Sequence, residues 1–170
     1  MRMQAGNLQW RAMRGADLPG VAALADRIHP SLPEDVSVFA ERLRLFPQGC
    51  LVLDAGTGGC LGYAVAHPWI EGSPPKLDTP LGVLPQPADC FYIHDVVVAP
   101  EARGQSLAAE AVERLLREAE AYRCAALVSV YATTPFWSRF GFSEAAGRLA
   151  PSALGSYGAD ARYMVRLTRR

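Results

Sequence analysis

A turn between an apolar run and a predicted helix is the part of the sequence best suited to bind a ligand. The apolar run is 96–99, and the residues that follow it at the turn and helix start are Arg103, Gly104, Gln105, Ser106, Leu107 and Ala108. Unpaired backbone N–H groups and the positive end of a helix dipole meet there, so an anion binds without a dedicated basic side chain. Small residues let a phosphate approach the backbone. The stretch therefore predicts a phosphate-binding turn, although neither Gly-x-Gly-x-x-Gly nor Gly-Lys-Ser/Thr is present.

Two residues with acid–base chemistry, His94 and Asp95, immediately precede this apolar run. The ordinary pKa of histidine suits a general base or a proton relay, and an aspartate can orient an amine. A histidine within a strand is more often a packed, hydrogen-bonded residue, so both interpretations of His94 stay open. Strand alternation predicts two faces, Phe91, Ile93, Asp95 and Val97 on one, and Tyr92, His94, Val96 and Val98 on the other. We therefore expect His94 and Asp95 to point in opposite directions.

Composition limits the classes of partner. The 170 residues fit one domain, 1–170, and half of them are apolar, which suffices for a sizeable core. The formal charge is zero, so the electrostatic attraction to nucleic acid or to an anionic membrane is missing. The first residues lack the apolar core of a signal peptide, and no apolar run approaches the roughly 18 residues of a membrane span. We expect a cytoplasmic protein without nucleic-acid or membrane partners.

The cysteines predict neither a metal site nor disulfides. Cys50, Cys60, Cys90 and Cys124 are spaced singly, without a Cys-x-x-Cys or Cys/His cluster. Structural zinc is therefore not expected, and a reducing compartment disfavours disulfides. We expect these residues to be mostly buried thiols.

The elements that must position these residues follow from hydrophobic periodicity and turn chemistry. Strands are expected at 8–13, 50–54, 60–69, 91–99, 126–131 and 162–168. Helices are expected from Asp17 to Ile28, at 36–46, after Arg103 and at 134–140. The glycine-rich segment 55–59 predicts a hairpin between the second and third strands. Segment 70–89, rich in Pro and Gly, predicts a long surface loop beside a site.

Two motifs in this order resemble the GNAT acetyltransferase superfamily. The turn is similar to the family's Arg/Gln-x-x-Gly-x-Gly/Ala, with Ser106 in place of the middle glycine. Segment 135–142, which reads PFWSRFGF, is similar to the family's Phe-Tyr-x-x-x-Gly-Phe. The resemblance covers most of the chain. It implies an α/β (α+β) fold with a mixed, mostly antiparallel sheet, a central splayed strand pair and helices on both faces.

The resemblance also implies a site and a reaction. Acetyl-CoA would be the co-substrate, with its pyrophosphate on 103–108 and its pantetheine along Val96, Val97 and Val98. A primary amine, from a small molecule or a protein N-terminus, would attack the thioester directly in a ternary complex, and no metal is needed. Trp137 would contact the cofactor, but it stands where the family has the tyrosine that protonates the departing thiolate. Tyr131 and Ser138 are the candidate substitutes, beside His94 and Asp95 as candidate catalytic residues.

Several alternatives remain at this point. The altered glycine and the missing tyrosine favour a non-catalytic acyl-CoA-binding or regulatory domain as the alternative function. A homodimer built through the last strand or the 70–89 loop is a further alternative. Ser106 either donates to a phosphate or pushes the turn outward through its Cβ. Four acidic residues, Glu34, Asp35, Glu71 and Asp78, either form a local acidic patch for the acceptor or are simply solvated.

Overall fold

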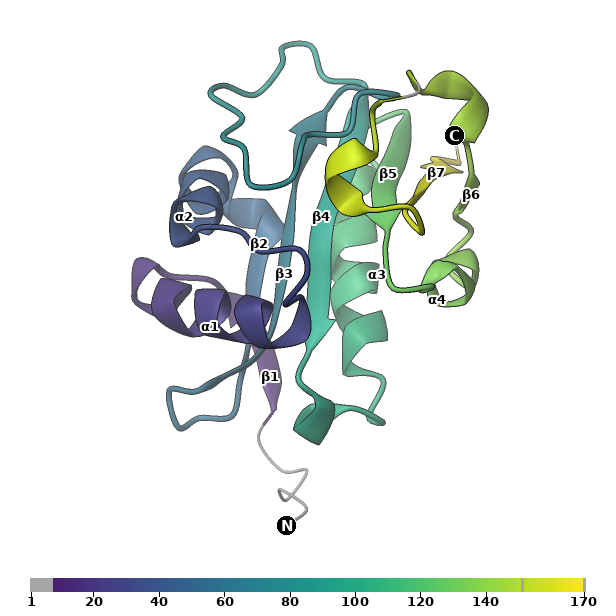
Figure 1. Ribbon diagram of the computed structural model, residues 1–170. Coiled ribbons are helices and arrows are strands. Elements are labelled where there is room, and N and C mark those ends of the chain that lie inside the picture. The colour runs from purple at the N-terminus through teal and green to yellow at the C-terminus, as the bar shows by residue number, and fades with distance from the viewer. Residues whose placement is uncertain (1–7, 151, 170) are drawn as a thin grey trace.

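Seven strands form one sheet in the computed structural model, which describes residues 8–150 and 152–169. The order across the sheet is β1-β2-β3-β4-β5-β7-β6 (Figure 1). The strands are β1 (Gln9–Ala12), β2 (Cys50–Asp54), β3 (Cys60–Trp69), β4 (Cys90–Val98), β5 (Cys124–Ser129), β6 (Ser143–Glu144) and β7 (Arg162–Leu167). All neighbours pair antiparallel except β4 and β5, which are parallel. The expected mixed, mostly antiparallel sheet is confirmed.

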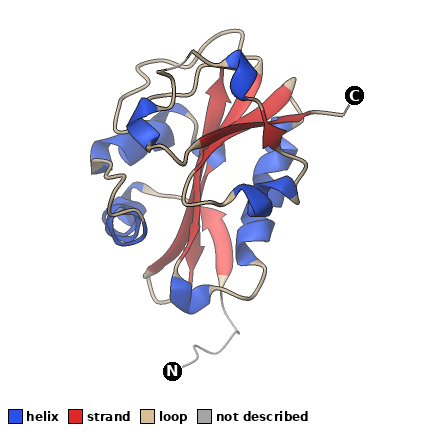
Figure 2. Ribbon diagram, turned by 45° about the vertical axis from the view of Figure 1, so that its right-hand side comes forward, coloured by secondary structure: helices blue, strands red, loops and turns tan. Residues whose placement is uncertain are grey.

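Helices cover both faces of this sheet (Figure 2). They are α1 (Leu18–Ile28), α2 (Val36–Leu45), α3 (Leu107–Ala119) and the short α4 (Thr134–Ser138). Single 3-10 turns lie at Gly15–Asp17, Pro47–Gly49, Pro100–Ala102, Ala146–Arg148 and Gly155–Tyr157. None of the helices in the described part of the chain combines the length and the apolar character that a bilayer span requires.

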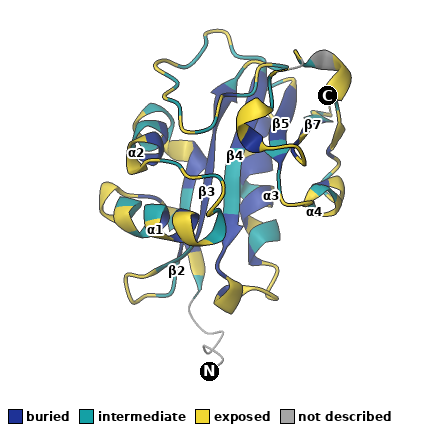
Figure 3. Cartoon of the chain, viewed as in Figure 1, coloured by how far each residue is buried: buried dark blue, intermediate teal, exposed yellow. Residues whose placement is uncertain are grey.

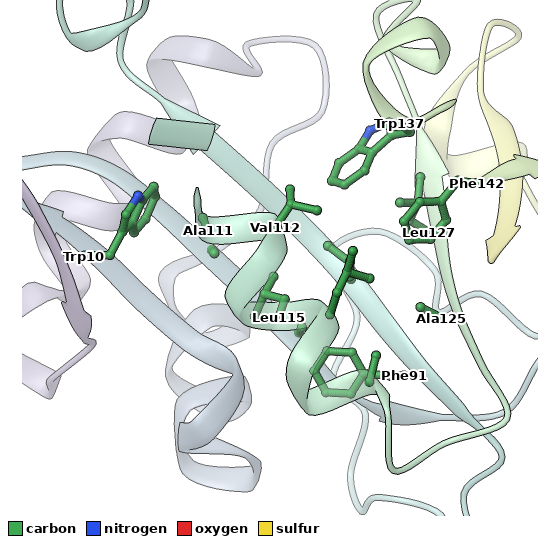
Figure 4. Packing of buried hydrophobic residues seen from close by; sticks show 14 of the residues in the cluster. Trp10, Phe91, Ala111, Val112, Leu115, Ala125, Leu127, Trp137 and Phe142 are labelled. Atoms are coloured by element: carbon green, nitrogen blue, oxygen red, sulfur yellow. The ribbon is translucent and has the colours of Figure 1, made fainter. Parts of the chain in front are cut away.

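Alternating side chains of the sheet build apolar clusters on both of its faces. On one face, Leu53 and Ala64 pack with the apolar stripe of α3 and with Trp10. Figure 4 shows this core, with Leu115 of α3 near Phe91 of β4. On the other face, Val52 and Tyr63 pack against α1 and α2. The outer surfaces of α1 and α2 are exposed, whereas β4 and β5 are mostly buried in the middle of the molecule (Figure 3).

A bulge in β4 changes the direction of its side chains. Val65 of β3 pairs with Asp95, and the next residue, Ala66, pairs with Ile93, so His94 is an extra residue without a partner on β3. A bulge of this kind reverses the alternation beyond it. Ile93 before it and Val96 after it both pack on the α3 core. The predicted opposite orientation of His94 and Asp95 is therefore wrong.

The central parallel pair separates halfway along β4. Pairing runs from Cys90 with Cys124 to Ile93 with Leu127, and no pair beyond these is found among the described residues. β5 ends at Ser129 because Tyr131 and Ala132 have left-handed backbones, with φ of 53° and 58°. The predicted strand 126–131 is thus displaced to Cys124–Ser129. The splayed pair leaves one edge of β4 without a partner, next to the start of α3.

The cysteines are mostly buried, as expected from the sequence. Cys50, Cys90 and Cys124 are buried, Cys60 is half-buried, and all four are free thiols. Burial raises the pKa of the Cys50 thiol to about 12, so this residue is inert at neutral pH.

Candidate functional site

The turn before α3 exposes a row of backbone donors. Gly104 has φ 89° and Ser106 has φ 56°, so the chain reverses direction through two left-handed residues. The first backbone bond into α3 runs from Glu110 N to Ser106 O at 3.1 Å. Among the described residues, no backbone carbonyl accepts from the amides of 104–109. These amides meet at the positive end of the α3 dipole, which is the geometry that binds an anionic oxygen.

The side chains of the turn leave this row open. Arg103 is exposed, and its Nε donates to the carbonyl of Val98 at 3.1 Å, which ties the turn to the end of β4. Glu101, two residues before Arg103, pairs with Arg27 of α1 at 2.5 Å. Ser106 occupies the N-cap position of α3 without a capping hydrogen bond from its hydroxyl. The Ser106 hydroxyl is therefore available to a ligand.

A cavity fills the gap where β4 and β5 separate. We call it the strand-gap cavity, and it contains about 470 Å³ of empty space including its open mouth. Its walls are His29, Ile93, His94, Asp95, Val96, Leu127, Val128, Val130, Tyr131, Thr133, Phe136 and Trp137. Because the β4 edge here has no strand partner, an extended ligand in this cavity meets free backbone groups on one side and apolar side chains on the other.

A second cavity adjoins the first at His94 and Asp95. This loop-side cavity, of about 370 Å³ including its mouth, is lined by His29, Leu32, Glu34, Leu77, His94, Asp95, Val128, Val130 and Tyr157. The two cavities share both histidines and Asp95. A ligand in the strand gap and a ligand on the loop side would therefore meet at these residues.

Two histidine–carboxylate pairs form the junction. His94 Nε2 lies 2.6 Å from Glu34 Oε1, and these two side chains are only 1% and 6% exposed. His29 Nε2 lies 3.0 Å from Asp95 Oδ2, which also accepts a 2.6 Å hydrogen bond from the hydroxyl of Tyr63. A proton on each Nε2 satisfies the carboxylates and leaves Nδ1 with a lone pair. The Nδ1 atoms of His29 and His94 are both buried and have no hydrogen-bond partner among the described residues.

The charges of these pairs follow from their contacts. Burial alone would raise the pKa of Asp95, but the hydrogen bond and charge of His29 hold it below the ordinary value. Burial likewise opposes ionisation of Glu34, while the charge and hydrogen bond of His94 lower the pKa of this carboxyl overall. Burial disfavours the protonated form of His29, yet its hydrogen bond to Asp95 raises the pKa of His29 overall. Both carboxylates are therefore ionised at neutral pH.

Tyr131 stands beside this junction in a strained conformation. Its ring stacks on His29 with 5.4 Å between centroids and 4° between planes, and its hydroxyl lies 2.9 Å from Ser31 Oγ. The side chain is 48% exposed, which excludes a core role. Left-handed backbone at two consecutive non-glycine residues costs energy, and such strain is often found at functional sites. The geometry places the phenol in the wall of the strand-gap cavity.

Of the other predicted catalytic and cofactor residues, some line the strand-gap cavity and others lie outside it. Trp137 is buried against Phe136 and Phe142 and lines the strand-gap cavity. Figure 4 shows Trp137 in the same apolar cluster as Leu127. Ser138 lines neither cavity, and its hydroxyl donates to the Thr134 carbonyl within α4 at 2.9 Å. The Val97 side chain is buried in the α1–α2 core, so only its backbone is near the gap.

The four acidic candidates do not form one patch. Glu34 lines the loop-side cavity and accepts from the Asp78 amide at 3.1 Å, while the Asp35 amide donates to Asp78 Oδ1 at 2.7 Å. Glu71 lies elsewhere, where it accepts a hydrogen bond from Arg123. Glu34 thus belongs to the site through its contact with His94.

Sequence reasoning missed His29 and Tyr63 as parts of the site. His29 ends α1 and Tyr63 lies on β3, so both reach Asp95 only through tertiary packing. Tyr157 was missed for the same reason, because it comes from a segment without regular periodicity. No local spacing in the chain connects these residues with β4.

Comparisons with known proteins agree with this geometry. A family model described as the acetyltransferase (GNAT) family matches residues 10–142. No curated protein matches the chain. Among solved structures, Ard1 from Thermoplasma volcanium superposes with a TM-score of 0.71 at 14% identity, covering 96% of this chain and 99% of that one. The CoA complex of YhbS, a GNAT family N-acetyltransferase from Escherichia coli, gives 0.61 at 21%, covering 99% and 86%.

A third solved structure extends the range of chemistry on this fold. The GNAT-like decarboxylase GphF in complex with isobutyryl-CoA superposes with a TM-score of 0.69 at 18% identity, covering 95% of this chain and 100% of that one. At these identities the likeness establishes the fold, whereas the reaction must be argued from the site itself.

Proposed function

The chain belongs to the GNAT acetyltransferase family, and from this premise we propose that it transfers an acetyl group from acetyl-CoA to a primary amine in a ternary complex. The observation that carries the proposal is the meeting of two cavities at His94 and Asp95. One cavity lies in the strand gap along β4, the strand that precedes the α3 turn. The other lies on the loop side and holds two ionised carboxylates beside apolar walls. A donor and an acceptor can thus occupy separate cavities and react at their junction.

Acetyl-CoA would bind through backbone geometry. The pyrophosphate oxygens would accept hydrogen bonds from the amides of 104–109 at the positive end of α3. Pantetheine would extend along the unpaired edge of β4, past Val96 and Val98, with Trp137 as an apolar wall. Support for CoA as the carrier comes from the solved structures of YhbS with CoA and of GphF with isobutyryl-CoA.

His94 would remove the proton from the acceptor. An alkyl amine with a pKa near 10.4 is less than about 0.1% neutral at pH 7, so a base at the site is chemically useful. His94 Nδ1 is buried and unpartnered, and Nε2 is held by Glu34 at 2.6 Å. Glu34 would fix the tautomer that leaves the Nδ1 lone pair free and would stabilise the imidazolium that forms. In this arrangement Glu34 is a positioning residue and His94 is the base.

The bond changes then balance without a covalent enzyme intermediate. The ammonium form of the acceptor first gives one proton to His94 Nδ1, which passes it to solvent. The neutral amine nitrogen then forms a bond to the thioester carbon, the C–S bond breaks, and its electron pair leaves on the CoA sulfur. The second proton of the attacking nitrogen passes to His94 Nδ1, which leaves a neutral amide. The thiolate takes a proton from the phenol of Tyr131, which lines the strand-gap cavity, or from solvent. Trp137 cannot supply this proton, because the indole N–H is not an acid at neutral pH.

A non-catalytic acyl-CoA-binding domain is the second candidate. The observation in its favour is Trp137, which occupies the motif position of the family's tyrosine and is packed into an aromatic cluster. In this case the strand-gap cavity would bind acyl-CoA, and the residues of the junction would have only a structural role.

One turnover experiment separates the two candidates. Purified protein is incubated with acetyl-CoA and a panel of primary amines, and both CoA release and the N-acetylated product are measured, the latter by mass spectrometry. An acetylated amine that forms with the wild type but not with His94→Gln supports the transferase. Protein that binds acetyl-CoA but acetylates no amine favours the binding domain.

A further inference from the structure

We infer that the acceptor is a small primary amine with an apolar body and no acidic group, and that this class excludes both free amino acids and protein N-termini. The inference rests on the proposed function and concerns the loop-side cavity. Three observations carry it: the charges on the cavity wall, a buried unpartnered nitrogen, and the segments that border the cavity.

The charges of the loop-side cavity select against an acid. Its ionisable residues are His29, Glu34, His94 and Asp95, and no lysine or arginine is among the described residues that line it. The two histidines of the lining, His29 and His94, already have their Nε2 atoms on Asp95 and Glu34. Arg42 is fully buried outside the lining, where Nη1 donates to Glu41 and to the Thr79 carbonyl. A carboxylate on the acceptor would therefore face Glu34 and Asp95 without a partner, whereas an ammonium group is attracted.

The unpartnered nitrogen of His94 indicates that a ligand completes this cavity. The His94 side chain is 1% exposed, and its Nδ1 has no hydrogen-bond partner among the described residues. Buried polar atoms in native proteins are almost always hydrogen-bonded, so an orphaned one needs an explanation. An N–H donor in the loop-side cavity supplies the missing bond, and an ammonium group is such a donor. The remaining wall is apolar, consisting of Leu32, Leu77, Val128, Val130 and the ring of Tyr157.

Three hydrogen bonds hold together the segments that border the outer side of the cavity. Loop 70–89 is tied to the C-terminal segment by the Tyr157 hydroxyl, which donates to the Pro75 carbonyl at 2.6 Å, and by the Leu77 amide, which donates to Ser156 Oγ at 3.0 Å. The loop is also tied to Glu34 through the Asp78 amide at 3.1 Å. Figure 1 shows this loop at the top of the molecule, between α2 and the C-terminal segment. These segments border the cavity on its outer side, so we expect a short apolar amine to fit and an extended peptide to be excluded.

A matched set of acceptors tests the charge and size arguments together. The set is 3-methylbutylamine, leucinamide, leucine and a hexapeptide with an N-terminal leucine, all with one apolar body. We expect kcat/KM for 3-methylbutylamine to be at least about tenfold higher than kcat/KM for leucine, because the carboxylates of the cavity repel the carboxylate of leucine. We expect a difference of at least the same size from the hexapeptide, because the peptide is too large for the cavity. Leucinamide, which lacks the acid, should fall between 3-methylbutylamine and leucine.

Variants connect the selectivity with the cavity charges. Glu34→Gln should lower the ratio of 3-methylbutylamine to leucine several-fold, whatever its effect on the overall rate. Asp26→Asn removes the same charge from an exposed position on α1 and should leave the ratio unchanged. A leucine rate equal to or above that of 3-methylbutylamine would overturn the inference and leave the transferase proposal intact, as would a preferred hexapeptide.

A binding measurement keeps the inference testable without turnover. If acetyl-CoA binds but no amine is acetylated, the proposed function fails, and 3-methylbutylamine and leucine are then titrated separately into the complex with CoA. Tighter binding of 3-methylbutylamine by at least about tenfold supports the inference on its own. Equal affinities, or no binding of either compound, overturn it.

Discussion

His94 and Asp95 are consecutive residues of β4, and their side chains nevertheless lie on the same face of the sheet. His94 contacts Glu34 and packs edge-on against Phe39 of α2, while Asp95 contacts His29 at the end of α1. The bulge at His94 produces this arrangement, because Val65 and Ala66 pair with residues on either side of it. One extra residue in a strand therefore assembles a site from α1, the α1–α2 connection and β4.

Removal of the proposed base should abolish catalysis without loss of the cofactor. We expect His94→Gln to lower kcat by at least about 100-fold, because a positioned base contributes about that much. Acetyl-CoA affinity, measured by calorimetry, should stay within about threefold, because the turn before α3 and the strand gap are unchanged. Near-wild-type turnover in this variant would contradict the role of His94 as the base.

The role of Glu34 predicts a smaller effect than removal of the base. Glu34→Gln should lower kcat roughly 10- to 100-fold, the cost of a lost hydrogen bond to a charged group. The KM for acetyl-CoA should change little, because Glu34 lines the loop-side cavity and not the strand-gap cavity. Glu34→Asp keeps the carboxylate and should recover part of the rate. No recovery in Glu34→Asp, or a large rise in the KM for acetyl-CoA, would indicate only structural damage.

Tyr131 and Ser138 offer a matched comparison of two hydroxyl groups. Tyr131→Phe keeps the ring that stacks on His29 and removes the phenol, so kcat should fall by about tenfold or more if the phenol protonates the thiolate. Ser138→Ala should leave kcat unchanged, because the serine hydroxyl is bonded to the Thr134 carbonyl within α4. Steady-state kinetics with acetyl-CoA in excess measures both. A larger loss in Ser138→Ala than in Tyr131→Phe would contradict this assignment.

Two small substitutions in the turn before α3 should differ in their effect on stability and on acetyl-CoA binding. Gly104 has φ 89°, so Gly104→Ala strains the backbone even though open space surrounds the position. We expect this variant to lose about 1 kcal/mol or more of unfolding free energy and to bind acetyl-CoA more weakly. Ser106→Gly accepts φ 56° without strain and should bind acetyl-CoA within about threefold of the wild type. Urea denaturation and calorimetry measure the two effects. A tenfold loss in Ser106→Gly would show that the hydroxyl binds phosphate.

The His29–Asp95 pair predicts a dependence of stability on pH. The pKa of His29 is raised in the folded protein above its ordinary value of 6.5, so the stabilisation is fully present below pH 6.5. It is lost as the pH rises through the folded pKa. The unfolding free energy should therefore decline above pH 6.5 in the wild type, and His29→Gln should show a flatter profile there. An identical slope in both proteins would contradict the ion pair.

Two other groups change the unfolding free energy in other pH ranges and do not interfere with the test of His29. The pKa of Asp95 is lowered, so its contribution is present above the ordinary value of 3.8 and is lost as the pH falls. Burial lowers the pKa of His67 to about 3, so this residue favours folding increasingly as the pH rises from 3 to 6.5 and changes little above that. His67→Gln is accordingly the control that leaves the slope above pH 6.5 intact.

Local chemistry in the sequence was sufficient for most of the regular elements, whereas β5 is displaced by two residues, α4 ends two residues early and β6 was not predicted. β2 and β3 begin and end where alternation and the glycine-rich turn predict, and α1 and α2 end within one residue of their predicted ends. The exposed turn before α3 and the splayed pair were also predicted, through the resemblance to a family. These features depend on residues close together in the chain.

Features set by tertiary pairing were not predictable in this way. The bulge at His94 is a property of the register between β3 and β4, which alternation within one strand does not contain. His29 and Glu34 reach β4 from more than 50 positions away. The left-handed backbone of Tyr131, which ends β5 early, has no glycine to indicate it. The junction of the two cavities thus lies where long-range contacts decide the structure.

Titration of acetyl-CoA into the CoA-free protein tests the central claim most directly, because every functional step depends on that complex. We expect micromolar binding by calorimetry for the wild type and weaker binding for Gly104→Ala, whose altered turn misplaces the free amides. No detectable heat from folded wild-type protein at several temperatures would contradict the account, since the strand gap and the α3 turn would then bind no acyl-CoA.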